Sequence, residues 1–196
     1  MKRMLIFLMF IFFCITGVYA GPFGLEMGMS LEDIKENCDN HQAEYAENDI
    51  YVITPIKKHP AFNKYLVWVD PDFGLYHIRA IQTNIKTNDS GTEAKAAFYN
   101  FEARLEKIYG KPDIVDGMIN NYTIFDEDYY WLYALQNGLR QLSAVWDPFI
   151  PDVNLKENLM TIALWVDYWD YKSTALFLDY YFTNSSDVEN TEDDVL

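Results

Sequence analysis

The sequence predicts an α+β fold, in which a mostly antiparallel sheet of five to seven strands carries one long amphipathic helix packed on one face. The sheet is indicated by short segments of alternating or β-branched apolar residues and by a hairpin signal near the middle of the chain. The helix is indicated by a 3.6-residue apolar period after Thr92. Because strands and helices do not alternate regularly, the order favours hairpins over parallel βαβ units.

Residues 21–34, "GPFGLEMGMSLEDI", contain the first elements of the predicted domain. Apolar residues at every second position from Phe23 to Met29 predict a strand. Ser30 then has the place of a helix N-cap, and Asp33 has the third helical position, from which a carboxylate reaches back to free N–H groups. A short helix ending near residues 37–40 follows, and the glycines would let backbones approach closely.

The hairpin signal consists of two strand-like runs, residues 65–69 and 75–81, on either side of "DPDFG". This connection supplies Pro and Asp for a turn and Gly for a positive-φ position. A calcium loop is the alternative, because Asp70 and Asp72 have the two-residue spacing of its ligands. However, Gly74 comes one position early and Ile81 stands where the bidentate acid belongs, so the turn is favoured.

The remaining elements follow from the same patterns. Thr92 is the predicted cap of the long helix, which ends at Gly110 and Pro112. Further strands are predicted at residues 51–56, 139–146, 160–168 and 174–183, and a short helix at residues 126–136. "LVWVD" at residues 66–70 is echoed by "ALWVD" at residues 163–167, which hints at an internal duplication, although chance reuse of a strand pattern explains so short a match more simply.

An apolar leader opens the chain. Lys2 and Arg3 precede an unbroken apolar run, and "VYA" before Gly21 offers small residues at the outer positions of a cleavage site. We therefore expect residues 1–20 to be a signal peptide, and the protein to be periplasmic or secreted with no membrane insertion after cleavage. A retained anchor is the alternative, but the run barely reaches the roughly 18 residues that a spanning helix needs. We expect residues 21–183 to form a single domain and residues 184–196 an acidic disordered tail.

The chain is strongly acidic. It has 15 basic and 30 acidic residues and a formal net charge of −15, which becomes −17 once Lys2 and Arg3 leave with the leader. Nucleic-acid binding depends on Lys and Arg displacing counterions from phosphates, so we expect no nucleic-acid partner. The net field favours a basic protein partner instead, although acidic surfaces also serve solubility alone.

Catalytic motifs are missing from the sequence. It contains no G-x-S-x-G, no H-E-x-x-H, no phosphate loop and no dinucleotide fingerprint. We therefore expect no enzyme, no catalytic residue, no metal and no cofactor. Acid pairs such as Asp167 and Asp170 leave a carboxylate-dependent hydrolase as the weakest alternative. Cys38, three residues before His41, has no partner for an intrachain disulfide once Cys14 is removed, and nothing nearby would complete a catalytic dyad.

Two aromatic clusters, surrounded by acidic residues, are the surplus that a folded core does not explain. Tyrosine and tryptophan need partners for their O–H and N–H groups when buried, so we expect both clusters to lie at the surface and to contact a partner. The predicted partner-binding residues are Tyr129, Tyr130, Trp131, Tyr133, Asp167, Tyr168, Trp169, Asp170 and Tyr171. Core packing is the competing interpretation of the same residues, and a sugar is a second ligand class for such a surface.

"FGLEMGMSLEDI" and the later "YGKP" at residues 109–112 resemble a pattern in small secreted bacterial proteins of unassigned function, and are loosely similar to the opening of BamE-like envelope domains. The match covers about 16 residues, the second half of the chain departs from it, and it transfers no functional residue. The resemblance implies an envelope-assembly accessory role as an alternative. The sequence itself favours an exported inhibitor or immunity protein for a basic partner.

Overall fold

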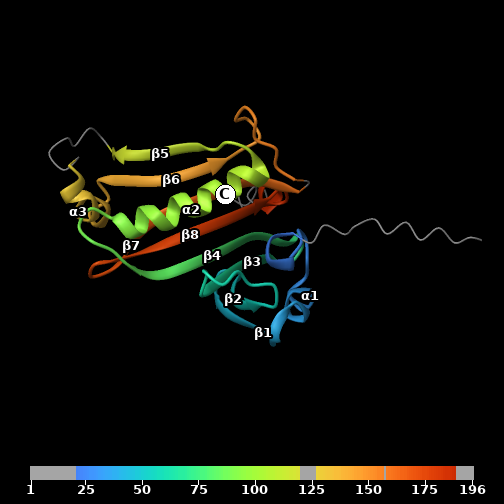
Figure 1. The fold of residues 1–196 in the computed structure, drawn as a ribbon. Helices are drawn as coiled ribbons and strands as arrows, with labels where there is room; N and C mark the ends of the chain where they lie inside the picture. Colours follow the sequence, from blue (N-terminus) through green and yellow to red (C-terminus); the bar gives the residue numbers. More distant parts are fainter. Residues whose placement is uncertain (1–20, 120–126, 157, 189–196) are drawn as a thin grey trace, which may run out of the picture.

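The computed structural model describes residues 21–119, 127–156 and 158–188. Figure 1 shows the arrangement of the helices and strands. In chain order they are η1 (Pro22–Gly24), α1 (Leu31–Glu36), β1 (Cys38–Glu47), β2 (Ile50–Pro55), β3 (Lys64–Asp70), β4 (Gly74–Lys86), α2 (Thr92–Tyr109), β5 (Asp113–Met118), η4 (Asp128–Tyr130), α3 (Trp131–Gln136), β6 (Arg140–Trp146), β7 (Leu159–Asp170) and β8 (Ser173–Phe182).

The strands of the described residues form one eight-stranded antiparallel sheet with the order β1-β2-β3-β4-β8-β7-β6-β5. The chain builds this sheet in two halves, because α1 precedes the meander β1–β4 and α2 precedes the meander β5–β8. The last strands of the two meanders, β4 and β8, pair at the centre through Arg79 and Asp179. The predicted α+β class with an antiparallel sheet is therefore confirmed.

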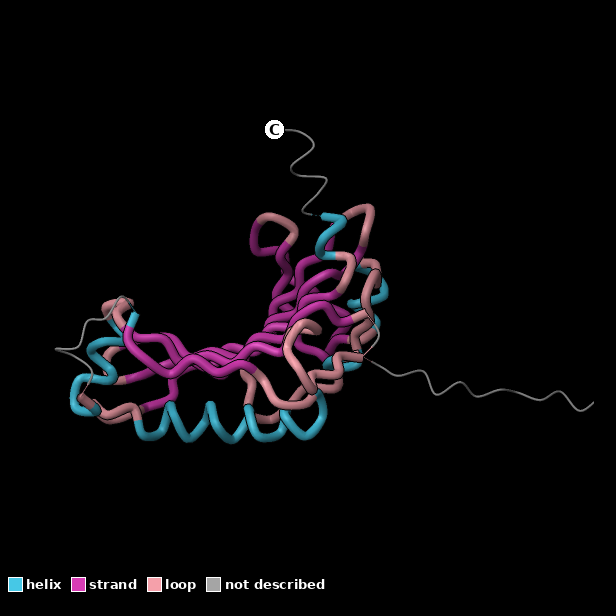
Figure 2. The backbone as a smooth tube through the Cα atoms, turned by 90° about the horizontal axis from the view of Figure 1, so that it is seen from above, coloured by secondary structure: helices cyan, strands magenta, loops and turns pink. Residues whose placement is uncertain are grey.

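Helix α2 covers one face of the sheet and leaves the other face open. Figure 2 shows α2 along the outer side of a bent sheet, and no described element crosses the inner side between its two ends. On β8 the side chains at every second position from Leu176 to Phe182 are buried in the core under α2. The residues between them, Phe177, Asp179 and Tyr181, therefore point to the inner face.

The predicted hairpin is confirmed as β3 and β4. Asp70 Oδ1 accepts hydrogen bonds from the backbone N–H groups of Asp72 and Phe73 at 2.8 and 2.9 Å, and so holds the turn. Gly74 has a φ of 69°, and a Cβ there would collide with the backbone of Gly28. The close backbone approach expected of the N-terminal glycines thus serves the contact between this segment and the start of β4.

The strand predicted at residues 23–29 is wrong. This segment begins with the 3₁₀ helix η1, and Phe23, Gly24 and Gly28 all have positive φ, which interrupts an extended conformation. The helix predicted after it is confirmed as α1. Ser30 Oγ accepts from the Asp33 N–H and Asp33 Oδ2 accepts from the Ser30 N–H, both at 3.2 Å, so the two residues form a capping box.

The sheet has eight strands rather than five to seven because the sequence pattern missed both edge strands. Most residues of β1 and β5 are exposed on both faces. A strand without a buried face has no period-two apolar pattern to reveal it. In β1 the register also shifts, and Asn40 and His41 have positive φ.

The folded domain extends past the predicted boundary at residue 183. Asn184 Nδ2 donates to the carbonyl groups of Phe73 and Leu75 at 3.0 and 3.1 Å, and the Ser185 hydroxyl donates to the carbonyl of Tyr76 at 2.9 Å. The prediction of a disordered tail is therefore wrong for residues 184–188. The expected signal peptide and residues 189–196 lie outside the described residues. No helix within the described ranges has the length and apolar character to span a membrane.

Candidate functional site

The two predicted aromatic clusters meet at one end of the sheet. The first lies on η4 and α3, and the second lies at the hairpin between β7 and β8. Between them is a groove with a volume of about 310 Å³. Its lining residues are Asp89, Tyr129, Tyr130, Leu132, Tyr133, Gln136, Tyr168, Tyr171 and Lys172. Five of the predicted partner-binding residues, all tyrosines, therefore line one groove, which we call the tyrosine groove.

The other four predicted residues lie outside this lining. Trp131 is fully buried and packs against Gly91, so its prediction as a surface contact is wrong. It lies on the face of α3 that also buries Leu132, Ala134 and Leu135. The remaining three, Asp167, Trp169 and Asp170, are exposed on β7 near its hairpin with β8.

The tyrosine groove is lined by one carboxylate and one cation, Asp89 and Lys172, and a second ion pair lies close to it. Lys172 Nζ lies 3.7 Å from Asp89 Oδ1, and Lys95 Nζ lies 3.0 Å from Asp128 Oδ1. The hydrogen bond and charge of Lys95 lower the pKa of Asp128. Both cations are thus held in ion pairs, while Asp170 adds an exposed carboxylate at the hairpin.

A second constellation, which sequence reasoning missed, lies at the centre of the inner face. The Asp179 side chain is 1% exposed and accepts three hydrogen bonds. Its Oδ1 accepts from His77 Nε2 at 2.6 Å and from Arg79 Nε at 2.7 Å, and its Oδ2 accepts from Trp165 Nε1 at 2.8 Å. We call these four residues the Asp179 network. It joins β4, β7 and β8 across the middle of the sheet.

The charge states within the network follow from its geometry. Burial by itself would raise the pKa of Asp179, but the hydrogen bonds from His77 and Arg79 and the charge of Arg79 outweigh it and lower the pKa. Burial lowers the pKa of His77, although Asp179 acts in the opposite direction. At neutral pH the network therefore holds a carboxylate, a guanidinium and a neutral imidazole, and its net charge is zero.

Aromatic rings surround this network in two stacks. The His77 ring lies between those of Trp68 and Tyr181, with centroids 4.0 and 4.1 Å away, and the Trp165 ring stacks on Phe177 at 4.0 Å. The Arg79 guanidinium lies 5.4 Å from the Trp68 centroid and 5.5 Å from the Trp165 centroid. Because neighbouring rings and Arg79 already cover ring faces, the inner face has little free flat aromatic surface for stacking a sugar.

The groups considered for metal binding and for a catalytic dyad are placed as follows. No group of three or more His, Cys, Asp or Glu side chains in the described ranges could hold a metal ion. Cys38 is buried, and burial raises the pKa of its thiol, whereas His41 is exposed. His77 is 5% exposed between two rings, which limits access of a substrate to its imidazole.

One signal in the sequence could have indicated the Asp179 network. Asp179 is the single charged residue within the apolar run "ALFLDYYF" on β8. A charge in a strand that is buried on both faces needs partners. Its partners His77 and Arg79 lie about 100 residues earlier, so only the pairing of β4 with β8 identifies them.

Comparisons with protein families, with curated proteins and with solved structures found no match to this chain.

Proposed function

We propose that the protein is an exported, non-enzymatic binding domain that acts as an inhibitor or immunity protein for a basic protein partner in the cell envelope. The observation that carries this proposal is the convergence of the predicted tyrosines into one groove. Tyr129 and Tyr171 are 66% and 75% exposed, although both are large and partly apolar. Tyrosine combines apolar area with a hydrogen-bonding group at low entropic cost, and it is enriched at protein interfaces.

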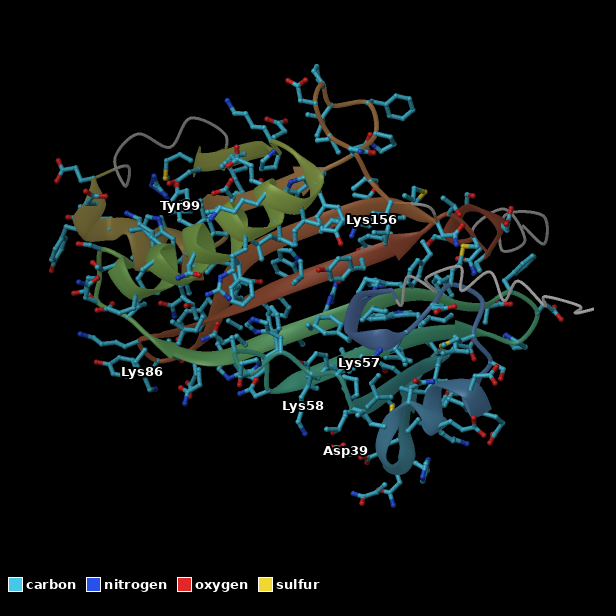
Figure 3. All side chains as sticks on the ribbon, turned by 45° about the vertical axis from the view of Figure 1, so that its right-hand side comes forward. Asp39, Lys57, Lys58, Lys86, Tyr99 and Lys156 are labelled. Carbon is cyan, nitrogen blue, oxygen red and sulfur yellow. The ribbon has the colours of Figure 1, made fainter. Side chains whose placement is uncertain are left out.

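The charge of the chain supports a basic partner. Basic residues are few, and Figure 3 shows labelled lysines at separate places: Lys86 lies far from Lys57 and Lys58. Near these, Lys58 Nζ already pairs with Asp39 Oδ2 at 2.7 Å. Because the chain has 30 acidic residues and 15 basic ones, its net negative field attracts a basic protein over long range. Salt screens that attraction beyond about 8 Å at physiological ionic strength.

The experiment is a pull-down from the envelope and secreted fractions of the producing cell at low salt, with the protein expressed from its full-length gene as bait. The bait variant Tyr129→Ala/Tyr133→Ala/Tyr171→Ala removes exposed rings of the tyrosine groove. The matched control Tyr45→Ala/Phe149→Ala removes exposed rings elsewhere, because Tyr45 lies on β1 and Phe149 follows β6.

We expect a basic protein to bind the wild-type bait and the control, to be released as salt rises, and to be lost with the groove variant. Retention on the groove variant would contradict a role for the tyrosine groove. If the only captured proteins are acidic, or if their binding does not change with salt, the proposed partner class is wrong.

A further inference from the structure

A row of paired residues crosses the whole sheet through the Asp179 network. Residues that pair directly across strands share one face of a sheet. From the β1 edge the row runs Glu44, Val52, Leu66 and Arg79. From the β5 edge it runs Asp113, Val145, Ala163 and Asp179. Arg79 pairs with Asp179 in the middle, so this inner-face row spans every strand of the sheet.

The inner-face row has the same charge pattern in both directions. Each edge strand contributes one exposed carboxylate, Glu44 on β1 and Asp113 on β5. Between these ends, two apolar side chains on each side lead to the Arg79–Asp179 ion pair, which has no net charge. The row is therefore negative at both ends, with two apolar residues on each side of a central ion pair.

The inner-face row lies on the concave side of the bent sheet. Figure 2 shows that the backbone of the sheet bends away from α2, so the inner face is the concave side of the sheet. Eight strands at about 4.8 Å spacing make the row about 34 Å long. At 1.5 Å per residue, an α-helix of about 22 residues has that length.

We propose that the inner face binds one amphipathic α-helix of the basic partner, laid across the strands. Its apolar face packs on the apolar residues of the row on either side of the central ion pair, and Lys or Arg side chains at its two ends lie against Glu44 and Asp113. The charge complementarity at both ends specifies this occupant, and the covered ring faces disfavour a sugar. The inference rests on the proposed function for the class of partner, but it concerns a different surface from the tyrosine groove.

A designed peptide of about 22 residues tests this inference directly. It carries leucines at helical spacing through its middle and lysines at both ends, and its counterpart carries glutamates in place of the lysines. Binding to the purified protein is measured by calorimetry at low salt. The variant Glu44→Gln/Asp113→Asn neutralises the two ends of the row. The matched control Asp72→Asn/Glu106→Gln makes the same charge change at exposed positions elsewhere, at the β3–β4 turn and on α2.

We expect the lysine peptide to bind one to one and the inner-face variant to weaken it by about fivefold or more, with little change in the control. Equal weakening by both variants would mean unspecific attraction and would overturn the inference. Equal binding of the glutamate peptide would mean an apolar ligand without charge selection, with the same consequence. If the pull-down identifies a basic partner but the peptide does not bind, this inference fails while the proposed function stands. If the peptide binds but the pull-down identifies no basic partner, the inner face is a helix-binding surface and the proposed function fails.

Discussion

The substitution Asp179→Asn should destabilise the fold strongly, because it changes a buried acceptor for three donors. If the Asn carbonyl oxygen takes the place of Oδ1, it keeps the bonds from His77 and Arg79 without the negative charge. The Asn amide group then takes the place of Oδ2 and faces the Trp165 indole N–H, donor against donor, at a site where 2.8 Å separates the atoms now. A flipped amide would lose two bonds instead of one.

The magnitude follows from these losses. One unsatisfied buried donor costs about 1–3 kcal/mol, and two charge-assisted bonds that become neutral lose about 1 kcal/mol each. The sum of about 3–5 kcal/mol equals the usual cost of removing one partner from a buried ion pair. For a domain of this size each kcal/mol lowers Tm by about 2–4 °C, so we expect Tm to fall by about 6–20 °C.

The assay is denaturant and thermal unfolding followed by tryptophan fluorescence, since Trp165 belongs to the network. The control is Asp167→Asn on β7, where the carboxylate is exposed and accepts a bond from the Tyr168 N–H, which an amide oxygen can also accept. We expect the control to change the free energy of unfolding by less than about 0.5 kcal/mol. A loss below about 1 kcal/mol for Asp179→Asn, with an unchanged denaturant slope, would refute the reasoning.

Three further predictions test other parts of the structure. Gly74→Ala should cost about 1–3 kcal/mol, because φ is positive and the new Cβ meets the Gly28 backbone, whereas Gly117→Ala, with no atom within 4 Å, should be tolerated; equal unfolding free energies would contradict this. Because burial raises the pKa of the Cys38 thiol, iodoacetamide should label it only when denaturant unfolds the chain, and rapid labelling of the folded protein would show that the site is open. The lowered pKa of His77 means that below about pH 6.5 the unfolded chain takes up a proton that the folded chain does not, so stability should fall as pH falls from there. His77→Gln should flatten this slope in thermal unfolding between about pH 6.5 and 5, and an unchanged slope would assign it to other groups.

The sequence predicted the parts of the fold whose signal is local. The strands that became β3, β4, β6, β7 and β8 each bury one face or both, so their apolar residues recur with a readable period. The edge strands β1 and β5 bury almost nothing, and the same reasoning could not find them. A false strand appeared before Ser30, because alternating Phe, Leu and Met side chains can also pack on a core from an irregular backbone.

The candidate site could also be predicted only where its signal is local. An excess of exposed tyrosines can be recognised within a short window, and those residues do line a common groove. Trp131 has the same composition around it as its neighbours, and only the helical period of α3 turns it into the core. The Asp179 network depends on a pairing between strands about 100 residues apart, for which no local pattern exists.

The strand order places the short echo between residues 66–70 and 163–167 at corresponding positions of the two meanders. These segments lie on β3 and β7, each the third strand of a meander that follows a helix. Their tryptophans, Trp68 and Trp165, lie on the inner face on either side of Arg79, at nearly equal distances of 5.4 and 5.5 Å.

Leu66 in the first copy of the motif pairs with Arg79, and Ala163 in the second pairs with Asp179, so Arg79 and Asp179 hold equivalent places in the two meanders. These places pair at the centre, where two identical charges would repel each other beside a side chain that is 1% exposed. An arginine in one half and an aspartate in the other convert that repulsion into an ion pair.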